Sequence, residues 1–400
     1  MWACSRDMQV GPGDPARMAG MRVVVAVDKF KGSLTGVEAN EWTARGVRAS
    51  LPEAQIETIP VADGGDGTLD AARAAGFTWT PVTCSGPTGE AVESGYALRT
   101  GVAVVEMADA CGLLRLPLAE EPGAGLPGMA ASSRGLGEVM AAALDAGCSE
   151  LVVGIGGSAS TDGGAGLLQA LGVRLLDESG DDIAPGLEGV LTVAAVDASG
   201  IHPGLAGVRL VIASDVQNPL LGAWGAAAVF GPQKGLTGEQ VALADEALAR
   251  LAALVEPVFE KRLRHGLRVC EAAGAGAAGG AGWALMLLGG KARRGIDVVL
   301  EWSSAEQAVA GADLVITGEG SLDEQSLAGK APIGVADLAR RHGVPVVAVS
   351  GRRLLDDGQL AAAGFSGAVA LTELEPSVER CIAEAGPLLE AAAARVVLTR

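Results

Sequence analysis

Short apolar runs alternate with helical patterns along almost the whole chain. RVVVAVD at 22–28 precedes a helical pattern at 37–49, and DLVITGEG at 313–320 begins a last series that includes VPVVAVSG at 344–351. Such runs, each followed by a helix, are typical of βα units, whose strands lie parallel in one sheet. The alternation therefore predicts an α/β fold built on parallel sheets.

The middle of the chain differs from its two ends. Residues 77–107 carry Thr/Val alternation and a G-P-T-G turn, which indicates an antiparallel ribbon or a crossing between domains. The chain has 400 residues, more than most single domains. We therefore predict a discontinuous, doubly wound Rossmann- or flavodoxin-like domain at 21–90 and 300–400, with a second α/β domain inserted at 91–299. Residues 1–20 are predicted to be a disordered extension.

Charge and composition exclude several classes of function. The 30 basic and 48 acidic residues give a net charge of −18, which disfavours binding to nucleic acid or to an anionic membrane surface. The six cysteines form no C-x-x-C and the three histidines no H-E-x-x-H, so a zinc site is not expected. A signal peptide and a transmembrane stretch are also missing. We expect a cytoplasmic protein.

Glycine-rich polar loops follow the apolar runs. In an open parallel sheet, ligands bind just beyond the carboxyl ends of the strands. Turn formation accounts for the glycines but not for the Asp, Asn, Gln and Lys residues between them, so we expect a ligand site there. The loops are D-K-F-K-G-S (28–33), A-D-G-G-D-G-T (62–68), G-G-S-A-S-T-D-G-G (156–164), S-D-V-Q-N-P-L (214–220), F-G-P-Q-K-G (230–235) and G-E-G-S-L-D-E-Q-S-L-A-G-K (318–330).

The lysines and the exposed glycine backbone of these loops are suited to binding phosphate. Of only six lysines, Lys31, Lys234 and Lys330 each adjoin a glycine in a loop. A compact ammonium beside exposed backbone is what a phosphate oxygen needs. The loop at 156–164 lies between a strand and a helix, and helix N-termini attract anions. The alternatives are ordinary solvated lysines and a turn that only brings strand and helix together.

Acidic residues in the same loops suit phosphoryl transfer. That reaction needs Mg²⁺ held by one or two carboxylates, and a group that accepts or orients the hydroxyl proton. Each acid taken singly also suits a turn or a helix N-cap. The candidates are Asp28, Asp63, Asp66, Asp162, Asp215, Glu319 and Asp323.

Three familiar nucleotide and hydrolase signatures do not apply. The G-x-G-x-x-G at 274–279 does not follow the first strand of a βαβ unit, which disfavours a dehydrogenase. The chain has no G-x-x-x-x-G-K-[ST], so a P-loop enzyme is excluded, and no G-x-S-x-G, which disfavours an α/β-hydrolase.

In their order and spacing, the loops resemble those of the type I glycerate kinases. The resemblance covers nearly all of residues 21–360 and includes DKFKGSL, GIGGSAS-T-DGG-AG, FGPQKG and GAGAAGGAG. It implies ATP- and Mg²⁺-dependent phosphorylation of D-glycerate, commonly at the 2-hydroxyl, in a cleft between two α/β domains. The chain departs from the pattern at Thr161, Gln217 and Ser321, where the family usually has Asn, Thr and Arg. These departures leave the acceptor and the phosphorylated position open.

The resemblance and the chemistry of the residues together suggest roles. Substrates would be D-glycerate and ATP, without nucleic acid or membrane partners, and homo-oligomer formation stays open. Two alternative functions are a kinase for another small hydroxy acid or polyol, and a nucleotide-binding regulatory protein without turnover. The expected site residues are Lys31, Asp63, Asp323 and Lys330 in catalysis; Asp28, Ser132 and Arg134 on the substrate; Gly156, Gly157, Ser158, Lys234 and Glu319 on the nucleotide; and Asp162 and Asp215 on the metal.

Overall fold

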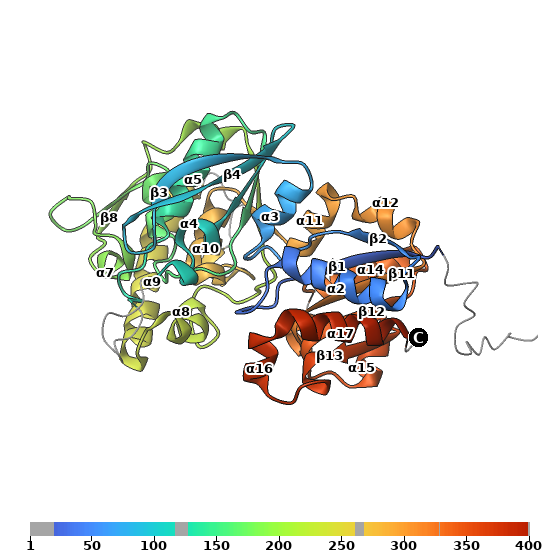
Figure 1. The fold of residues 1–400 in the computed structure, drawn as a ribbon. Coiled ribbons are helices and arrows are strands. Elements are labelled where there is room, and N and C mark those ends of the chain that lie inside the picture. Colours follow the sequence, from blue (N-terminus) through green and yellow to red (C-terminus); the bar gives the residue numbers. More distant parts are fainter. Residues whose placement is uncertain (1–19, 117–126, 261–267, 328, 399–400) are drawn as a thin grey trace, which may run out of the picture. The chain divides into compact units, whose positions relative to one another are not determined.

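The chain forms two compact units, which are drawn in Figure 1. The computed structural model describes residues 20–116, 127–260, 268–327 and 329–398. The split unit comprises the described residues up to Val61 and from Ser303 onward, and the inserted unit comprises Ala62–Trp302. The predicted α/β class is confirmed. Residues 1–19 of the predicted extension lie outside the described residues.

The inserted unit begins earlier in the chain than predicted. Strand β3 (Thr78–Ser85) pairs antiparallel with β4 (Ala91–Arg99), and β4 pairs antiparallel with β5 (Val102–Glu106). This ribbon confirms the prediction for 77–107. Because β3 is bonded into the sheet of the inserted unit, residues 62–90 belong to that unit and not to the first domain.

The split unit is built on a five-stranded sheet with the order β13-β12-β11-β1-β2. All neighbouring strands are parallel. Counted within the unit, this is the 2-1-3-4-5 order of flavodoxin-like folds, with its switch point between β1 and β11. The strands are β1 (Arg22–Val27), β2 (Gln55–Thr58), β11 (Leu314–Leu322), β12 (Val346–Arg353) and β13 (Gly367–Ala370).

Helices cover both faces of this sheet. Val23, Val25 and Ile316 belong to the core cluster under α2 and α17, two helices that lie side by side in Figure 1. Because strand side chains alternate, the next residues along each strand face the opposite layer, where α14 packs against β11 and β12. The helices are α2 (Gly36–Ser50), α12 (Ala305–Ala310), α13 (Glu324–Leu327), α14 (Ala331–Arg341), α15 (Asp357–Ala362), α16 (Val378–Ala383) and α17 (Ala385–Leu398).

The inserted unit is built on a six-stranded mixed sheet with the order β10-β9-β6-β5-β4-β3. Its β5, β6, β9 and β10 are mutually parallel, so their carboxyl ends share one edge. A separate two-stranded antiparallel sheet was not predicted from the sequence. The further strands are β6 (Glu150–Gly154), β9 (Arg209–Ala213) and β10 (Lys291–Arg293), with β7 (Arg174–Leu176) and β8 (Ala195–Asp197) in the two-stranded sheet.

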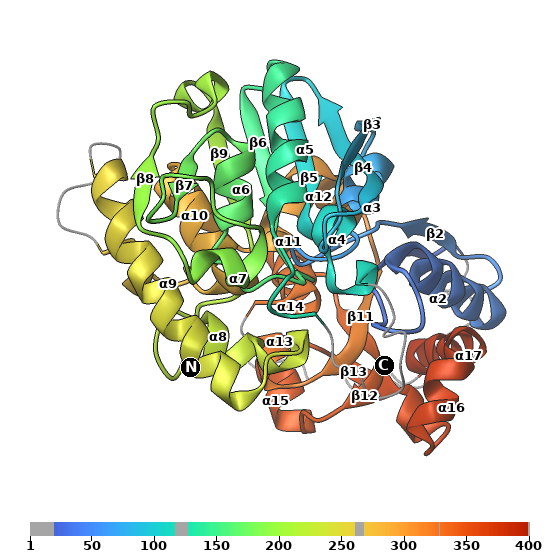
Figure 2. The ribbon, with the colours of Figure 1, turned by 90° about the vertical axis from the view of Figure 1, so that its left-hand side faces the viewer.

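The larger core of the inserted unit lies on the face covered by α5, α6, α9 and α10, and α5 and α6 lie beside each other in Figure 2. A smaller cluster on the other face lies under α3 and α11. No helix in the described part of the chain is long and apolar enough to cross a membrane. The helices are α3 (Thr68–Ala74), α4 (Met107–Cys111), α5 (Arg134–Asp145), α6 (Ala165–Ala170), α7 (Gly186–Val190), α8 (Ala226–Phe230), α9 (Gly238–Phe259), α10 (Ala281–Leu287) and α11 (Gly295–Trp302).

Candidate functional site

The loop after β1 lies at the switch point of the split unit's sheet. Asp28 is buried, and its Oδ1 accepts a hydrogen bond of 2.7 Å from the Lys29 N–H and lies 3.6 Å from the Lys29 Nζ. Lys31 is exposed. Gly320 of β11 packs against this loop, and a Cβ there would lie 3.4 Å from the Lys31 backbone nitrogen. The carboxyl end of β1 therefore places one buried carboxylate and two lysines in a single short loop next to β11.

Glu319 and Lys330 form an ion pair at the same edge of this sheet. Glu319 lies on β11 and is buried, whereas Lys330 immediately precedes α14 and is half-buried. The Lys330 Nζ lies 3.6 Å from Glu319 Oε2. The structure thus brings two predicted site residues together across a gap of eleven positions in the sequence.

Asp323 is held by its own loop. Its carboxylate accepts hydrogen bonds from the Ser321 hydroxyl at 3.0 Å and from the N–H groups of Gln325 and Ser326 at 3.0 and 3.3 Å. Burial alone would raise the pKa of Asp323. The Ser321 hydroxyl, the Lys330 ammonium and the two N–H groups together outweigh burial, so the pKa lies below its usual value. A lowered pKa makes a carboxylate a poor proton acceptor. Asp323 therefore suits a positioning role better than the predicted catalytic one.

Asp162, a predicted metal ligand in the inserted unit, is fully buried and surrounded by donors. Its Oδ2 accepts from the N–H and the hydroxyl of Ser133, at 2.8 Å each, and from the Gly166 N–H at 3.2 Å. Its Oδ1 accepts from the Gly164 N–H at 3.0 Å. Four donors use the lone pairs that a carboxylate offers. This speaks against the metal role and also against an open phosphate site at the start of α6.

Lys234, a predicted phosphate ligand, is also buried. Its Nζ donates to the Ser158 hydroxyl at 2.7 Å and to the Ser160 carbonyl at 2.6 Å. Burial lowers the pKa of Lys234 to about 8, although the nearby Asp162 charge opposes this. Both bonds end on the loop at 156–164, so this ammonium fixes the loop and is not the accessible cation that the sequence predicted.

The glycines of the same loop have different environments. The Gly156 N–H donates to the Gly64 carbonyl at 3.2 Å, so this predicted phosphate donor is used inside the unit. Gly157 is exposed and has a φ of +74°, a conformation that glycine adopts without strain. Of the three positions at 156–158 predicted to bind nucleotide, Gly157 is the one that leaves its backbone exposed.

Asp63 and Asp215 lie close to each other at the carboxyl end of β9. The Gly295 N–H donates to Asp215 Oδ1 at 3.2 Å, and the missing side chain of Gly295 leaves room for the Asp63 backbone. Asp215 Oδ2 is buried and has no hydrogen-bond partner among the described residues. Burial, followed by the neighbouring Asp63 charge, raises the pKa of Asp215 to about 7. A cation at this position would relieve both effects.

Ser132 and Arg134, the predicted carboxylate ligands, lie at the start of α5. The Ser132 hydroxyl accepts a hydrogen bond of 3.2 Å from the Arg134 N–H. The Arg134 Nε donates to Glu138 one turn along the helix, at 2.9 Å, and Glu138 in turn accepts from the Ser85 N–H at 2.7 Å. Arg134 is exposed. Its Nε is therefore engaged, and an anion would have to bind its terminal Nη groups.

Glu106 is a site residue that the sequence reasoning missed. It ends β5, is 4% exposed, and accepts hydrogen bonds from the N–H groups of Gly67 and Leu69 at 3.3 and 2.8 Å. Gly67 is the N-cap of α3 and Leu69 lies in its first turn, where the loop that carries Asp63 ends. The signal was a glutamate at the end of the apolar run VAVVE, whereas β6 and β9, parallel strands of the same sheet, end in Gly and Ala. Glu106 holds the 62–68 loop on the sheet.

We expect Glu106→Gln to change how stability depends on pH. Burial, with the Asp66 and Asp109 charges, raises the pKa of Glu106 to about 8, although the Leu69 N–H opposes this. The unfolded chain therefore binds fewer protons between about pH 4.5 and 8, and this residue's contribution to stability is lost as pH rises through that range. Gln does not titrate, so the stability of the variant relative to the wild type should improve from pH 5 to pH 8. Thermal unfolding at several pH values measures this, and parallel profiles for the variant and the wild type would contradict it.

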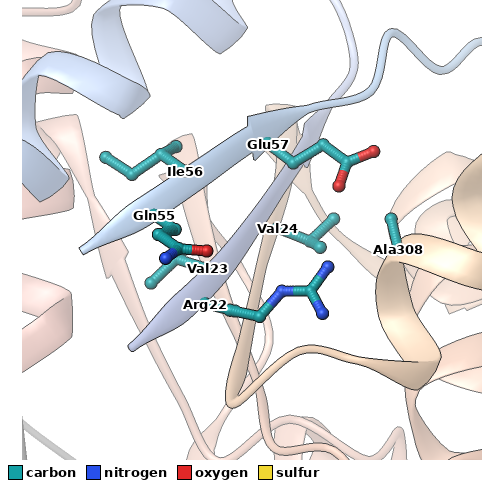
Figure 3. Close-up of a pocket in the computed structure, with 7 residues that line it drawn as sticks. All are labelled: Arg22, Val23, Val24, Gln55, Ile56, Glu57 and Ala308. Atoms are coloured by element: carbon teal, nitrogen blue, oxygen red, sulfur yellow. The ribbon is translucent and has the colours of Figure 1, made fainter. Parts of the chain in front are cut away.

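A pocket of about 310 Å³ in the split unit lies elsewhere (Figure 3). None of the predicted site residues lines it. Arg22 is the first residue of β1, so the pocket reaches the amino end of that strand, opposite to the end that carries the ligand loops. The lining residues are Arg22, Val23, Val24, Gln55, Ile56, Glu57 and Ala308.

Comparisons with known proteins agree with one another. The model of the glycerate kinase family matches residues 23–400. The chain is 42% identical over 335 residues to glycerate kinase from Bacillus subtilis, covering 83% of this chain and 85% of that protein. It is 39% identical over 345 residues to glycerate 2-kinase from Escherichia coli, covering 84% and 86%. A crystal structure described as "putative glycerate kinase 2" from Salmonella typhimurium matches with a TM-score of 0.74 and 39% identity, over 95% and 98% of the two chains. These matches confirm the resemblance found in the loops.

Proposed function

Because the chain belongs to the glycerate kinase family, we propose that it transfers the γ-phosphoryl group of ATP to the 2-hydroxyl of D-glycerate. The observation that carries the proposal is the family match over 23–400, joined by relatives that cover more than four fifths of the chain. The 2-position rests on the Escherichia coli relative, which is a glycerate 2-kinase. Phosphorylation at the 3-hydroxyl, giving 3-phosphoglycerate, is the alternative product.

Phosphoryl transfer relies mainly on charge neutralisation and positioning. We propose that Lys31 and Lys330 neutralise the transferring group, since both lie at the carboxyl edge of the split unit's sheet. The exposed Gly157 N–H is proposed to bind a phosphate oxygen, and the Arg134 Nη groups to bind the glycerate carboxylate. Lys234, Ser158 and Gly156 would act indirectly, by holding the loop that contains Gly157.

Asp215 fits a magnesium ion, and Asp162 does not. The Asp215 Oδ2 lacks a donor among the described residues and lies near a second carboxylate, whereas the Asp162 oxygens are used by four donors. The described residues contain no cluster of three or more metal-ligating side chains. Mg²⁺ bound together with nucleotide phosphates needs only one or two carboxylates. The ion would neutralise charge on the phosphate oxygens.

The transfer itself exchanges one P–O bond for another. The glycerate hydroxyl oxygen bonds to the γ-phosphorus, the bond from that phosphorus to the β–γ bridging oxygen breaks, and ADP leaves. The hydroxyl proton needs an acceptor. Among the predicted acids, Asp323 has a lowered pKa and Asp28 lies against Lys29. We therefore propose that Asp63 accepts or orients this proton.

We expect Asp215→Asn to weaken magnesium binding without unfolding the protein. The substitution removes a charge from a half-buried carboxylate beside Asp63, so the metal-free protein should be at least as stable as the wild type. The Mg²⁺ concentration for half-maximal activity should rise at least about tenfold, because an amide oxygen is a weaker ligand than a carboxylate. Activity measured against MgCl₂ and melting temperatures without metal give the two values. An unchanged Mg²⁺ requirement would remove Asp215 from the metal site.

A coupled assay of ADP release tests the proposed reaction against its rivals. D-glycerate, lactate, glycerol and tartronate are offered as acceptors at equal concentration with ATP and MgCl₂. Highest kcat/KM for D-glycerate is expected. A higher value for another acceptor would identify a kinase for a different hydroxy acid or polyol. ADP release with none of the four, together with measurable nucleotide binding, would favour a regulatory protein.

A further inference from the structure

We infer that Arg352 binds an oxyanion of the substrates at the carboxyl edge of the split unit's sheet, beside Lys330. The inference rests on the proposed function and adds a binding residue to it. Arg352 lies near the end of β12, in register with Ser321 of β11. Neither residue adjoins the other in sequence, so only the strand pairing brings them together.

The strand register places Arg352 on the same face as the ion pair at this edge. In β11, Glu319 and Ser321 are two residues apart and therefore point to one face. Ser350 and Arg352, their register partners in β12, share that face. Val347 and Val349 belong to the core under α2 and α17, so the residues between and after them face the layer of α14. Lys330 immediately precedes α14 and pairs with Glu319 across this face.

The guanidinium of Arg352 is fixed through its Nε. Its Nε donates a hydrogen bond of 2.9 Å to the Ser321 hydroxyl, which itself donates to Asp323 Oδ2 at 3.0 Å. Asp323 is fixed in turn by the N–H groups of its loop. The chain from Asp323 through Ser321 to Arg352 therefore orients the planar group, while the side chain stays exposed.

The opposite edge of the guanidinium is open. Within the described ranges, neither Nη1 nor Nη2 of Arg352 hydrogen-bonds to another residue, in contrast to the neighbouring Arg353, which pairs with Asp357 and Glu373. An oriented guanidinium with free N–H groups matches two oxygens of a phosphate or a carboxylate. The nearby acids do not compete for these groups, because Glu319 pairs with Lys330 and Asp323 binds its own loop. Arg352 is thus suited to bind an oxyanion, either the phosphate tail of the nucleotide or the carboxylate of glycerate.

Titration calorimetry with two probes tests the inference and separates the two sources. Sodium tripolyphosphate represents the nucleotide tail, and D-glycerate supplies the carboxylate. Arg352→Ala should weaken binding of one probe about tenfold or more, since a charge-assisted pair is lost. Arg352→Lys should recover part of the loss, and Ser321→Ala should give an intermediate loss because it releases the Nε. Weakened tripolyphosphate assigns the nucleotide tail, and weakened D-glycerate assigns the carboxylate.

A matched control and a stability measurement keep the test specific. Arg340 is another exposed arginine, at the far end of α14, that pairs with Asp337, and Arg340→Ala should leave both affinities unchanged. Melting temperatures of the Arg352 variants should stay at the wild-type value, because a purely structural residue would lower them. The inference would be overturned if Arg352→Ala bound both probes with affinities within twofold of the wild type. It would also be overturned if the wild type bound neither probe. ADP release with D-glycerate by the same preparations tests the proposed function separately, because a kinase that is active with and without Arg352 would refute only the role of this residue.

Discussion

Lys31→Ala should lower kcat with D-glycerate by on the order of 10²–10³, because a cation that neutralises the transferring phosphoryl group acts in the transition state. Lys31 is exposed at the switch point of a flavodoxin-like sheet, where β1 and β11 end. The substitution removes the ammonium and leaves the backbone of the loop, which packs on Gly320, in place. Steady-state kinetics with ATP and D-glycerate measure the change.

Two companion variants make the Lys31 result specific. Lys31→Arg keeps the positive charge and should retain more activity than Lys31→Ala. Lys291→Ala removes another exposed lysine, at the start of β10 and thus at the amino end of its strand, and should leave kcat unchanged. A Lys31→Ala enzyme with wild-type kcat would eliminate this residue from the reaction.

Asp162→Ala should destabilise the protein by about 3–5 kcal/mol, the range found when one member of a buried, hydrogen-bonded charged set is removed. Its carboxylate joins the start of α6 to the start of α5, through Gly164, Gly166 and Ser133. Removing it leaves these donors buried without an acceptor and leaves the Lys234 ammonium without a nearby negative charge. Urea unfolding followed by circular dichroism measures the loss.

The same variant separates a structural role from a metal role. Asp181→Ala, on an exposed turn, should change stability by no more than about 0.5 kcal/mol. If Asp162 were a metal ligand, its replacement would raise the Mg²⁺ requirement and leave the metal-free protein as stable as before. That outcome would contradict the assignment made from its four hydrogen bonds.

The sequence predicted where the site residues lie along each strand but not where their side chains point. A polar residue after an apolar run is expected beyond the carboxyl end of a strand, and the loops of Asp28, Asp63 and Asp215 follow strands in this way. Glu319 instead lies within β11, which continues to Leu322. The same pattern holds whether a side chain faces solvent or the start of the next helix. Asp162 therefore looked like a metal ligand, although its carboxylate points into the unit.

Features that depend on pairing between distant segments were not predictable. The domain junction was placed at 90/91 because the ribbon at 77–107 was recognised but its partner sheet was not. Lys234 adjoins a glycine, as a phosphate-binding lysine would, yet it packs under a loop more than seventy residues away. Arg352 gains its neighbour Ser321 only through the register of β11 and β12.

Proton-coupled ³¹P NMR of the reaction products tests the proposed function most directly. Purified protein is incubated with ATP, MgCl₂ and D-glycerate, and the phosphomonoester signal is recorded. Phosphate on the 2-hydroxyl couples to one methine proton, so the predicted product gives a doublet while ATP is converted to ADP. A triplet, from coupling to the two methylene protons of 3-phosphoglycerate, would contradict the 2-position, and no new phosphomonoester signal would contradict the kinase reaction itself.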